Sequence, residues 1–315
     1  MMKQPIFLSP VFQERIWGGQ KLKTLFSYEI PYERTGECWA ISAHPNGQSV
    51  VKDGEYQGQK LGELWSSHPE LFESNAPTFP LLTKILDASD NLSVQVHPND
   101  EYAGTYENGE LGKTECWYIV DAEPGAEIIY GHAAETKEQL IQYIEEEKWD
   151  DLFTQVPVQA GDFFYVPSGT IHALGKGIVV LETQQSSDTT YRVYDYNRID
   201  KDGNTRELHL EKAIDVTTVP SVYTPATPEQ IQEAGISITN FVSNEFFTVQ
   251  KWDVDGTATI PSHKKYTICS VIAGTGELQI ADHSYSLQKG DHFILPVQFG
   301  PYILQGELSL IISRE

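Results

Sequence analysis

The sequence has few cysteines and no long apolar run, and each shortage excludes a class of protein. Its three cysteines are an odd, sparse set without C-x-x-C spacing, so a disulfide framework is not expected. No apolar run approaches the roughly 18 residues of a membrane helix. The first stretch, MMKQPIFLSPVFQERIWGGQ, lacks the continuous apolar segment of a secretion signal. These shortages predict a cytoplasmic protein.

Basic residues are also scarce. The 315 residues include 22 Lys or Arg against 45 Asp or Glu, which gives a formal net charge of −23. A chain this acidic repels nucleic acids and anionic membranes, so neither is expected as a partner. Against this background, a few Lys and Arg gathered at one site need an explanation.

The residues that are present form a mainly β pattern. Short runs rich in β-branched and aromatic residues alternate with Gly, Pro, Asn and Asp turns, as in SVQVHP, ECWYIVDAEPGAEIIYG, GIVVLETQQSS, FFTVQKWDV and YTICSVIAGTGELQI. This pattern is typical of an all-β sandwich or barrel. The length allows about two domains of roughly 150 residues each.

One segment has the pattern of a helix. In TKEQLIQYIEEEKWDDLF, Thr136 and Gln139 form a capping-box pair, and apolar residues follow at helical spacing. We predict a short helical insertion over about residues 133–153. A weaker helical stretch is KLGELWSSHPELF.

A repeated unit predicts two similar domains. GDFFYVPSGTIHAL (161–174) is echoed by GDHFILPVQFGPYIL (290–304), and upstream YIVDAEPGAEI (118–128) matches SVIAGTGELQI (270–280). Each upstream block predicts a strand, a Gly turn and another strand. We predict two jelly-roll barrels, over residues 1–230 and 231–315. The blocks resemble the two short motifs of the cupin superfamily, in which these motifs supply metal ligands.

The first copy carries a candidate metal site. Gln95 and His97 are two apart on a predicted strand, so their side chains share a face. Glu115 opens the next strong strand, and His172 follows the Gly-Asp turn. Two imidazoles, a carboxylate and an amide suit a borderline divalent ion such as Zn²⁺, with room left for water or substrate.

The other histidines lack this company. His44-Pro45 repeats the dipeptide of His97-Pro98 and is interpreted as a decoy. In the second copy Pro301 stands opposite His172, so that domain is expected to keep the fold without the site. Five further histidines are interpreted as surface or packing residues: His132, His209, His263, His283 and His292.

Charged residues surround the candidate ligands. Lys84, Lys113 and Arg192 bracket them in sequence, and Arg is well suited to binding phosphate. Glu182 and Asp188 lie in the same segment as Arg192 and are candidates for acid–base work. The basic set predicts recognition of an anionic small molecule.

The motifs also resemble a known family. RIWGG, GECWAIS, LSVQVHP, KTEC, SGTIHAL and SSDTTYRVYDYNR, between about residues 10 and 200, are similar as a set to those of the type I phosphomannose isomerases in their short bacterial form. The segment YRVYDYNR departs from the longer forms, which have a Gly and a Lys soon after the matching Arg. A phosphate contact from that Lys therefore does not transfer.

The resemblance implies zinc bound by Gln95, His97, Glu115 and His172. It implies a sugar-phosphate substrate and the reversible conversion of mannose 6-phosphate to fructose 6-phosphate, by proton transfer through a cis-enediol. Ser93 matches a phosphate contact, and Lys113 and Arg192 are candidates to hold phosphate or the enediolate. Family active-site positions are matched by Lys84, Lys113, Glu182, Asp188 and Arg192, with Lys84 and Arg192 a candidate pair for ring opening.

Three other functions fit a cupin barrel, because fold alone does not determine activity. An iron-dependent dioxygenase needs a site rich in His and carboxylate, and Gln95 with the basic residues argues against it. A non-catalytic sugar-phosphate-binding protein would return its ligand unchanged. A structural or storage protein gives no reason to gather four ligand-type groups in one copy only.

Overall fold

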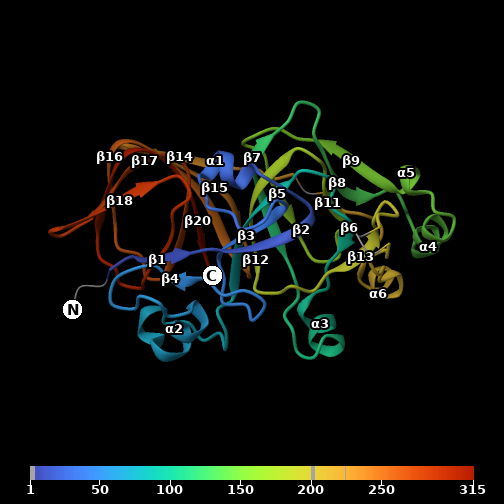
Figure 1. The fold of residues 1–315 in the computed structure, drawn as a ribbon, viewed down its shortest axis with the longest axis horizontal. Coiled ribbons are helices and arrows are strands. Elements are labelled where there is room, and N and C mark those ends of the chain that lie inside the picture. The colour runs from blue at the N-terminus through green and yellow to red at the C-terminus, as the bar shows by residue number, and fades with distance from the viewer. Residues whose placement is uncertain (1–3, 200–202, 224) are drawn as a thin grey trace.

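The structure is a computed structural model that describes residues 4–199, 203–223 and 225–315. Within those ranges the strands form three sheets, all of antiparallel pairs, and the helices are short (Figure 1). The mainly β class expected from the sequence is confirmed. The order of the central six-stranded sheet is β10 (Phe163–Val166), β7 (Glu115–Ala122), β12 (Ile178–Gln185), β5 (Leu81–Ala88), β3 (Thr35–Ile41) and β2 (Val11–Gly19).

Two further sheets lie beside it. The five-stranded sheet has the order β13 (Tyr191–Tyr194), β6 (Val94–Val96), β11 (His172–Leu174), β8 (Glu127–His132) and β9 (Phe153–Pro157). The nine-stranded sheet has the order β14 (Glu229–Glu233), β15 (Ile236–Ser243), β16 (Thr248–Ile260), β20 (Tyr302–Arg314), β17 (Thr267–Ile280), β19 (His292–Leu295), β1 (Ile6–Ser9) and β4 (Val50–Val51), with β18 (His283–Gln288) paired to β17.

The helices flank the sheets. Their bounds are α1 (Lys21–Phe26), α2 (Leu61–Ser67), the 3₁₀ turn η1 (Pro69–Leu71), α3 (Asp100–Tyr106), α4 (Lys137–Glu145), α5 (Trp149–Leu152) and α6 (Leu210–Val216). In Figure 1, α4, α5 and α6 lie at the end of the molecule farthest from the orange and red strands of the nine-stranded sheet. In the described ranges, no helix is long and apolar enough to cross a membrane.

The six-stranded sheet is buried on both faces, and every residue of β3, β5 and β12 is buried. Since side chains alternate along a strand, each strand supplies two faces. On one face Cys38, Ile85 and Leu181 join an apolar cluster with Ile268 and Ile311 of the nine-stranded sheet. The central sheet is therefore a wall shared by both halves of the molecule.

The opposite face of this wall packs on the five-stranded sheet. Leu86, Ile119 and Val180 share a cluster with Ile128 and Leu174. Farther along the same face the residues become polar. Lys84 and Trp117 are the cross-strand neighbours of Glu182 there. The interior of the sandwich is thus apolar at one end. At the other end it is polar, and we call this region around Lys84, Trp117 and Glu182 the polar mouth.

The outer face of the five-stranded sheet is covered by helices. Val94 and Val96 of β6 pack in a cluster with Leu140 and Ile144 of α4. Because alternate residues of a strand face opposite ways, Gln95 between the two valines faces the inside of the sandwich. The helical insertion thereby orients the strand that leads into the polar mouth.

The predicted insertion is helical but divided. Thr136 caps α4 by accepting a hydrogen bond from the Gln139 backbone N–H at 3.2 Å. Gln139 Oε1 accepts instead from the Glu135 N–H at 2.8 Å, one residue before the position that a capping box requires. Glu147 then adopts a left-handed φ of 52°, which ends the first helix before α5 begins at Trp149. The weaker helical stretch forms α2 and η1.

The sequence repeat is a structural repeat at its Gly-Asp turns. Gly161 and Gly290 have φ values of 97° and 94°. Asp162 and Asp291 each accept a backbone hydrogen bond at 2.9 Å from the residue three before. The same turn therefore introduces β10 in one copy and β19 in the other.

The upstream part of the repeat differs from expectation. The first copy has the predicted strand, turn and strand, but residues 267–280 form the single strand β17. The strand continues through a bulge near Val271, and Gly274 has a φ of 78°. A Cβ on Gly274 would lie 1.9 Å from the Glu307 carbonyl oxygen. Glycine there allows the close approach of β20, so the chain bends without turning back.

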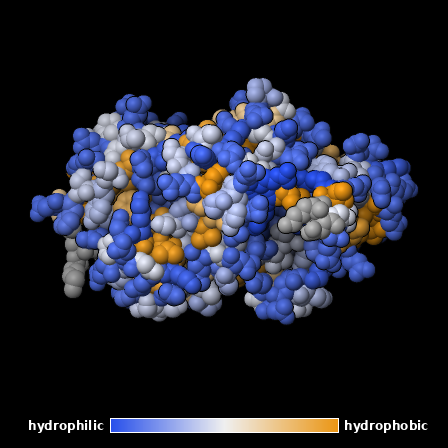
Figure 2. All heavy atoms as spheres, in the orientation of Figure 1, coloured by the Kyte–Doolittle hydropathy of each residue, from blue (hydrophilic) through white to orange (hydrophobic). Residues whose placement is uncertain are grey.

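The surface agrees with the acidic composition. Figure 2 shows a face on which hydrophilic residues dominate and apolar residues form separate small patches. The buried apolar residues lie instead in clusters between the sheets and beneath the helices.

Candidate active site

Three predicted metal ligands meet at the polar mouth of the sandwich. His97 Nε2 lies 3.5 Å from one carboxylate oxygen of Glu115, and His172 Nε2 lies 3.4 Å from the other. The three donor atoms are all within 4.8 Å of one another, and the three side chains are at most 1 % exposed. Among the described residues, this is the group of His, Cys, Asp and Glu side chains with metal-binding geometry.

Backbone carbonyls set the tautomer of both histidines. His97 Nδ1 lies 2.9 Å from the Thr189 carbonyl oxygen, and His172 Nδ1 lies 2.8 Å from that of Thr170. A carbonyl can only accept, so each Nδ1 carries the hydrogen and each Nε2 presents a lone pair to the centre. This outer hydrogen bond is typical of metal-binding histidines.

Gln95 lies beside these ligands. Gln95 is directly opposite His172 in the register of β6 and β11, and Gln95 Nε2 is 3.3 Å from His172 Nε2. A half-turn of the carboxamide brings Oε1, the metal-binding atom, to the same point. His97 Nε2 and Glu115 Oε1 are buried without a hydrogen-bond partner among the described residues, and Glu115 Oε2 is buried beside the ammonium of Lys113 at 3.1 Å. A divalent cation with nitrogen and oxygen preference fits this donor set.

Electrostatics keep the ligands in their metal-binding forms. Burial opposes ionisation of Glu115, but the ammonium of Lys113, 3.1 Å away, holds the pKa of this carboxyl well below its usual range. Burial, followed by the charge of Lys113, lowers the pKa of His97 to about 3. Burial also lowers the pKa of His172. At neutral pH the set is therefore one carboxylate and two neutral imidazoles.

Glu182 and Lys84 form a second buried layer. Glu182 accepts a hydrogen bond from Trp117 Nε1 at 3.1 Å and lies 3.8 Å from Lys84 Nζ. Burial and then the negative charge of Glu115 raise the pKa of Glu182 to about 7. Lys84 Nζ also lies 4.8 Å from the ring centroid of Trp39. Glu182 can therefore take up and release a proton near neutral pH.

Arg192 and Ser93 form a separate polar pair near Gln95. In the sheet register Arg192 pairs with Gln95. The Arg192 Nε–H donates to Ser93 Oγ at 3.3 Å, and Nη1 donates to the Glu207 carbonyl oxygen at 2.8 Å. A guanidinium and a hydroxyl beside a metal site can bind the oxygens of an anion.

Two arginines that sequence reasoning did not assign lie next to this pair. Arg198 and Arg206 both hydrogen-bond the buried carboxylate of Asp195. Burial, followed by the charge of Arg206, lowers the pKa of Arg192. The two arginines therefore lie close enough to Arg192 for their charges to affect it. Arg198 belongs to the motif SSDTTYRVYDYNR, which was noted in the sequence. Its spacing from Arg192 did not predict that the two side chains lie close together.

Asp188 lies at the rim of the site. It is partly exposed, and its Oδ2 accepts a hydrogen bond from Asn46 Nδ2 at 2.9 Å. The next residue, Thr189, supplies the carbonyl that orients His97. His44, interpreted from sequence as a decoy, belongs to the same turn as Asn46 and is buried beside Trp39. His44 is not among the clustered metal-binding side chains, and its interpretation as a decoy stays a prediction.

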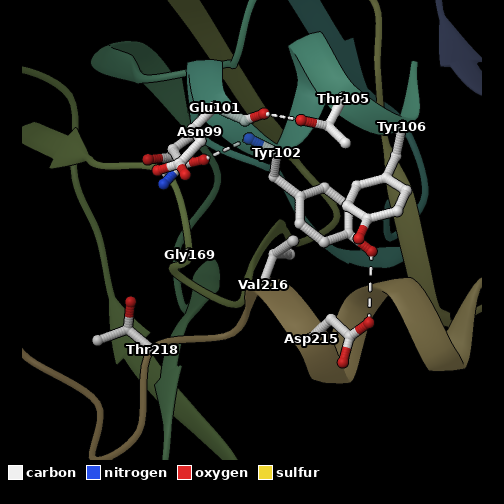
Figure 3. A pocket seen from close by; sticks show the side chains of 10 residues that line it. Asn99, Glu101, Tyr102, Thr105, Tyr106, Gly169, Asp215, Val216 and Thr218 are labelled. Atoms are coloured by element: carbon white, nitrogen blue, oxygen red, sulfur yellow. Dashed lines mark hydrogen bonds between the residues drawn. The ribbon is translucent and has the colours of Figure 1, made fainter.

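A hollow between α3 and α6 is distinct from this site (Figure 3). Its volume is about 490 Å³, and Glu101, Tyr102, Tyr106 and Asp215 are among its lining residues. The Tyr102 hydroxyl donates to Asp215 at 3.4 Å. The lining carries carboxylates and no Lys, Arg or His, so it does not suit a phosphate.

Comparison with known proteins accounts for these features. A family model described as phosphomannose isomerase type I, catalytic domain, matches residues 6–123, and one described as mannose-6-phosphate isomerase, cupin domain, matches residues 237–315. A curated mannose-6-phosphate isomerase of Bacillus subtilis is 54 % identical over the full length of both chains. The chain belongs to the type I phosphomannose isomerase family. This confirms the resemblance seen in the motifs and identifies an enzyme of the aldose–ketose isomerase class.

Other family members agree. A mannose-6-phosphate isomerase of Streptococcus mutans is 54 % identical over 99 % of both chains. The crystal structure of a mannose 6-phosphate isomerase from Bacillus subtilis superposes with a TM-score of 0.97 at 52 % identity, over 99 % of each chain. A phosphomannose isomerase variant from Salmonella typhimurium shares the fold, with a TM-score of 0.81 at 15 % identity over 99 % and 100 % of the two chains. The domain boundary near residue 230 and the cytoplasmic location stay predictions.

Proposed function

We propose that this isomerase is zinc-dependent and interconverts mannose 6-phosphate and fructose 6-phosphate through a cis-enediol. The observation that carries the proposal is the buried triad of His97, Glu115 and His172, whose ligand atoms converge beside Lys113. Gln95 is the proposed fourth ligand. When bound, the zinc supplies Lewis-acid polarisation of the sugar oxygens that gain negative charge.

The phosphate group is assigned to the arginine end of the site. The Arg192 Nε–H donates to Ser93 Oγ, so the guanidinium and the hydroxyl lie side by side and the Ser93 O–H remains to donate to a phosphate oxygen. Lys113 lies on the metal side, and we propose that its ammonium stabilises the enediolate while it holds Glu115 ionised. Binding of the remote phosphate then positions C1 and C2 of the sugar for reaction.

Proton transfer between C1 and C2 is assigned to Glu182. It is buried, and its raised pKa of about 7 suits a group that must take up and release a proton at neutral pH. Asp188 is partly exposed and held by Asn46 at the rim, so we propose a role in substrate contact for it. Lys84, which pairs with Glu182, and Arg192 remain the proposed pair for ring opening.

The first experiment is to incubate zinc-loaded protein with mannose 6-phosphate and follow fructose 6-phosphate, with an EDTA-treated sample alongside. We expect product formation that is lost on chelation and restored by zinc. The variant Glu115→Gln tests the ligand set, and Glu277→Gln, an exposed carboxylate on β17, is its matched control. We expect loss of bound zinc and of turnover only in the first variant.

Each competing function has its own signature in this assay. Bound mannose 6-phosphate that is returned unchanged by zinc-loaded protein identifies a binding protein. Oxygen uptake with ferrous iron identifies a dioxygenase. Turnover that survives complete removal of zinc and other divalent metals refutes the metal-dependent mechanism.

A further inference from the structure

We propose that the turn His44–Gly47 is a wall of the substrate site, in which His44 donates a hydrogen bond from Nε2 to a hydroxyl oxygen on C3, C4 or C5 of the open-chain sugar. The inference rests on the proposed isomerase function. It assigns a specificity-determining contact to a residue that no sequence motif of the site includes.

The first support is position. The turn follows β3, which directs Trp39 onto the polar face of the shared wall. The Trp39 and His44 rings meet edge to face with centroids 5.8 Å apart, and Lys84 Nζ lies 4.8 Å from the Trp39 centroid. Lys84 in turn pairs with Glu182. Only the side chains of Trp39 and Lys84 therefore lie between His44 and Glu182 in this series of contacts.

The second support is the fixed tautomer of His44. Its Nδ1 accepts a hydrogen bond from the Asn46 backbone N–H at 3.2 Å, so the ring hydrogen is on Nε2. Nε2 has no hydrogen-bond partner among the described residues and is not one of their fully buried polar atoms, so its N–H remains accessible to a ligand although the residue as a whole is 6 % exposed. Burial lowers the pKa of His44 against the opposing negative charges of Asp188 and Glu110, and the charge of Lys84 adds to the lowering. The imidazole is thus a neutral, oriented donor.

The third support is the link across the rim. Asn46 Nδ2 donates to Asp188 Oδ2 at 2.9 Å. Thr189, adjacent to Asp188, accepts the hydrogen bond that orients His97. The turn therefore contacts the wall strands on one side and the loop that orients a metal ligand on the other. We therefore place the sugar of the proposed complex beside this turn.

The ligand chemistry follows from the donor. Under the proposed function, the metal takes the oxygens of C1 and C2, and the arginine end takes the phosphate. A neutral N–H donor suits the remaining hydroxyl oxygens on C3, C4 and C5. A donor aimed at one of them distinguishes sugar phosphates that differ in the configuration of that carbon, because a misplaced hydroxyl leaves the N–H unpaired in the complex.

Two substitutions separate the contact from the fold of the turn. In His44→Asn, the side-chain oxygen can replace Nδ1 as the acceptor for Asn46, but the donor at Nε2 is lost. In His44→Gln, the amide nitrogen can replace Nε2. The control is His283→Asn, on an exposed strand. Each protein is assayed for bound zinc and for kcat/KM with mannose 6-phosphate and its 3-deoxy, 4-deoxy and 5-deoxy analogues.

We expect His44→Asn to lower kcat/KM for mannose 6-phosphate on the order of 10- to 100-fold with zinc content unchanged, and His44→Gln to recover much of the loss. For the analogue that lacks the contacted hydroxyl, wild type and His44→Asn should be nearly equal. An equal loss on mannose 6-phosphate and all three analogues, or no loss at all, overturns the inference. Absence of turnover in the zinc-loaded wild type refutes instead the proposed function on which it rests.

Discussion

Glu182 is predicted to reduce stability while it serves the reaction. Its pKa rises from the usual 4.5 to about 7, because it is fully buried and faces the charge of Glu115. The folded protein therefore holds a proton on Glu182 that the unfolded chain has released between these pH values. Stability falls as pH rises through this window, since the folded state binds more protons. At about 1.4 kcal/mol per pKa unit, the penalty above pH 7 is about 3 kcal/mol.

The variant Glu182→Gln removes this titration and keeps the shape of the side chain. Metal-free protein is the correct sample, because a bound cation changes the charge at Glu115. Urea unfolding of EDTA-treated wild type and variant is compared at pH 5 and pH 8, with tryptophan fluorescence as the signal. We expect the variant to gain about 2–3 kcal/mol relative to wild type between the two pH values, and to lose most isomerase activity when zinc is restored.

The comparison between the two pH values isolates the titration. The variant also loses its ion pair with Lys84. Any effect of that loss on the free energy of unfolding that is the same at pH 5 and pH 8 cancels when the two pH values are compared. The control Glu277→Gln replaces an exposed carboxylate and should show no pH-dependent gain. A Glu182→Gln variant with the same relative stability at pH 5 and pH 8, or one that is favoured at pH 5 instead, refutes the assignment of a buried carboxyl with a raised pKa.

Three further predictions concern other parts of the molecule. Arg192→Ala should lower kcat/KM for mannose 6-phosphate by roughly 100-fold or more with zinc retained, because charge-assisted contacts to phosphate are strong, and unaltered kinetics would remove Arg192 from the mechanism. His172→Ala should abolish the several-degree rise in Tm that zinc gives the chelated wild type, as followed by calorimetry. Gly274→Val should cost on the order of 3 kcal/mol in urea unfolding, because a left-handed φ and the Glu307 carbonyl oxygen both oppose a side chain; an unchanged midpoint would contradict the bulge geometry.

Sequence reasoning reached the candidate metal ligands because each lies at a position that local patterns mark. Gln95 is in β6 and His97 follows that strand directly, while Glu115 and His172 each begin a strand of one of the two facing sheets. The structure brings three of these donors together and places the fourth beside them.

Contacts made by loops could not be predicted from the sequence in the same way. Asn46 and Asp188 are 142 residues apart in the chain, and neither carries a periodic signal. The grouping of Arg198 and Arg206 around Asp195 likewise depends on the path of an irregular segment. The uninterrupted course of β17 was missed because glycine is common to turns and bulges, and only the approach of a neighbouring strand decides between them.

The doubly buried central sheet gives the C-terminal half of the chain a mechanical role. Residues of β16, β17, β19 and β20 bury the back of the strands whose front carries Lys84, Glu115 and Glu182. A shortened chain that ends near residue 230 would expose that apolar face, and the strands that position Glu115 and Glu182 would lose their packing on one side. The C-terminal sheet is thus a scaffold, because the rigidity of the candidate active site depends on it.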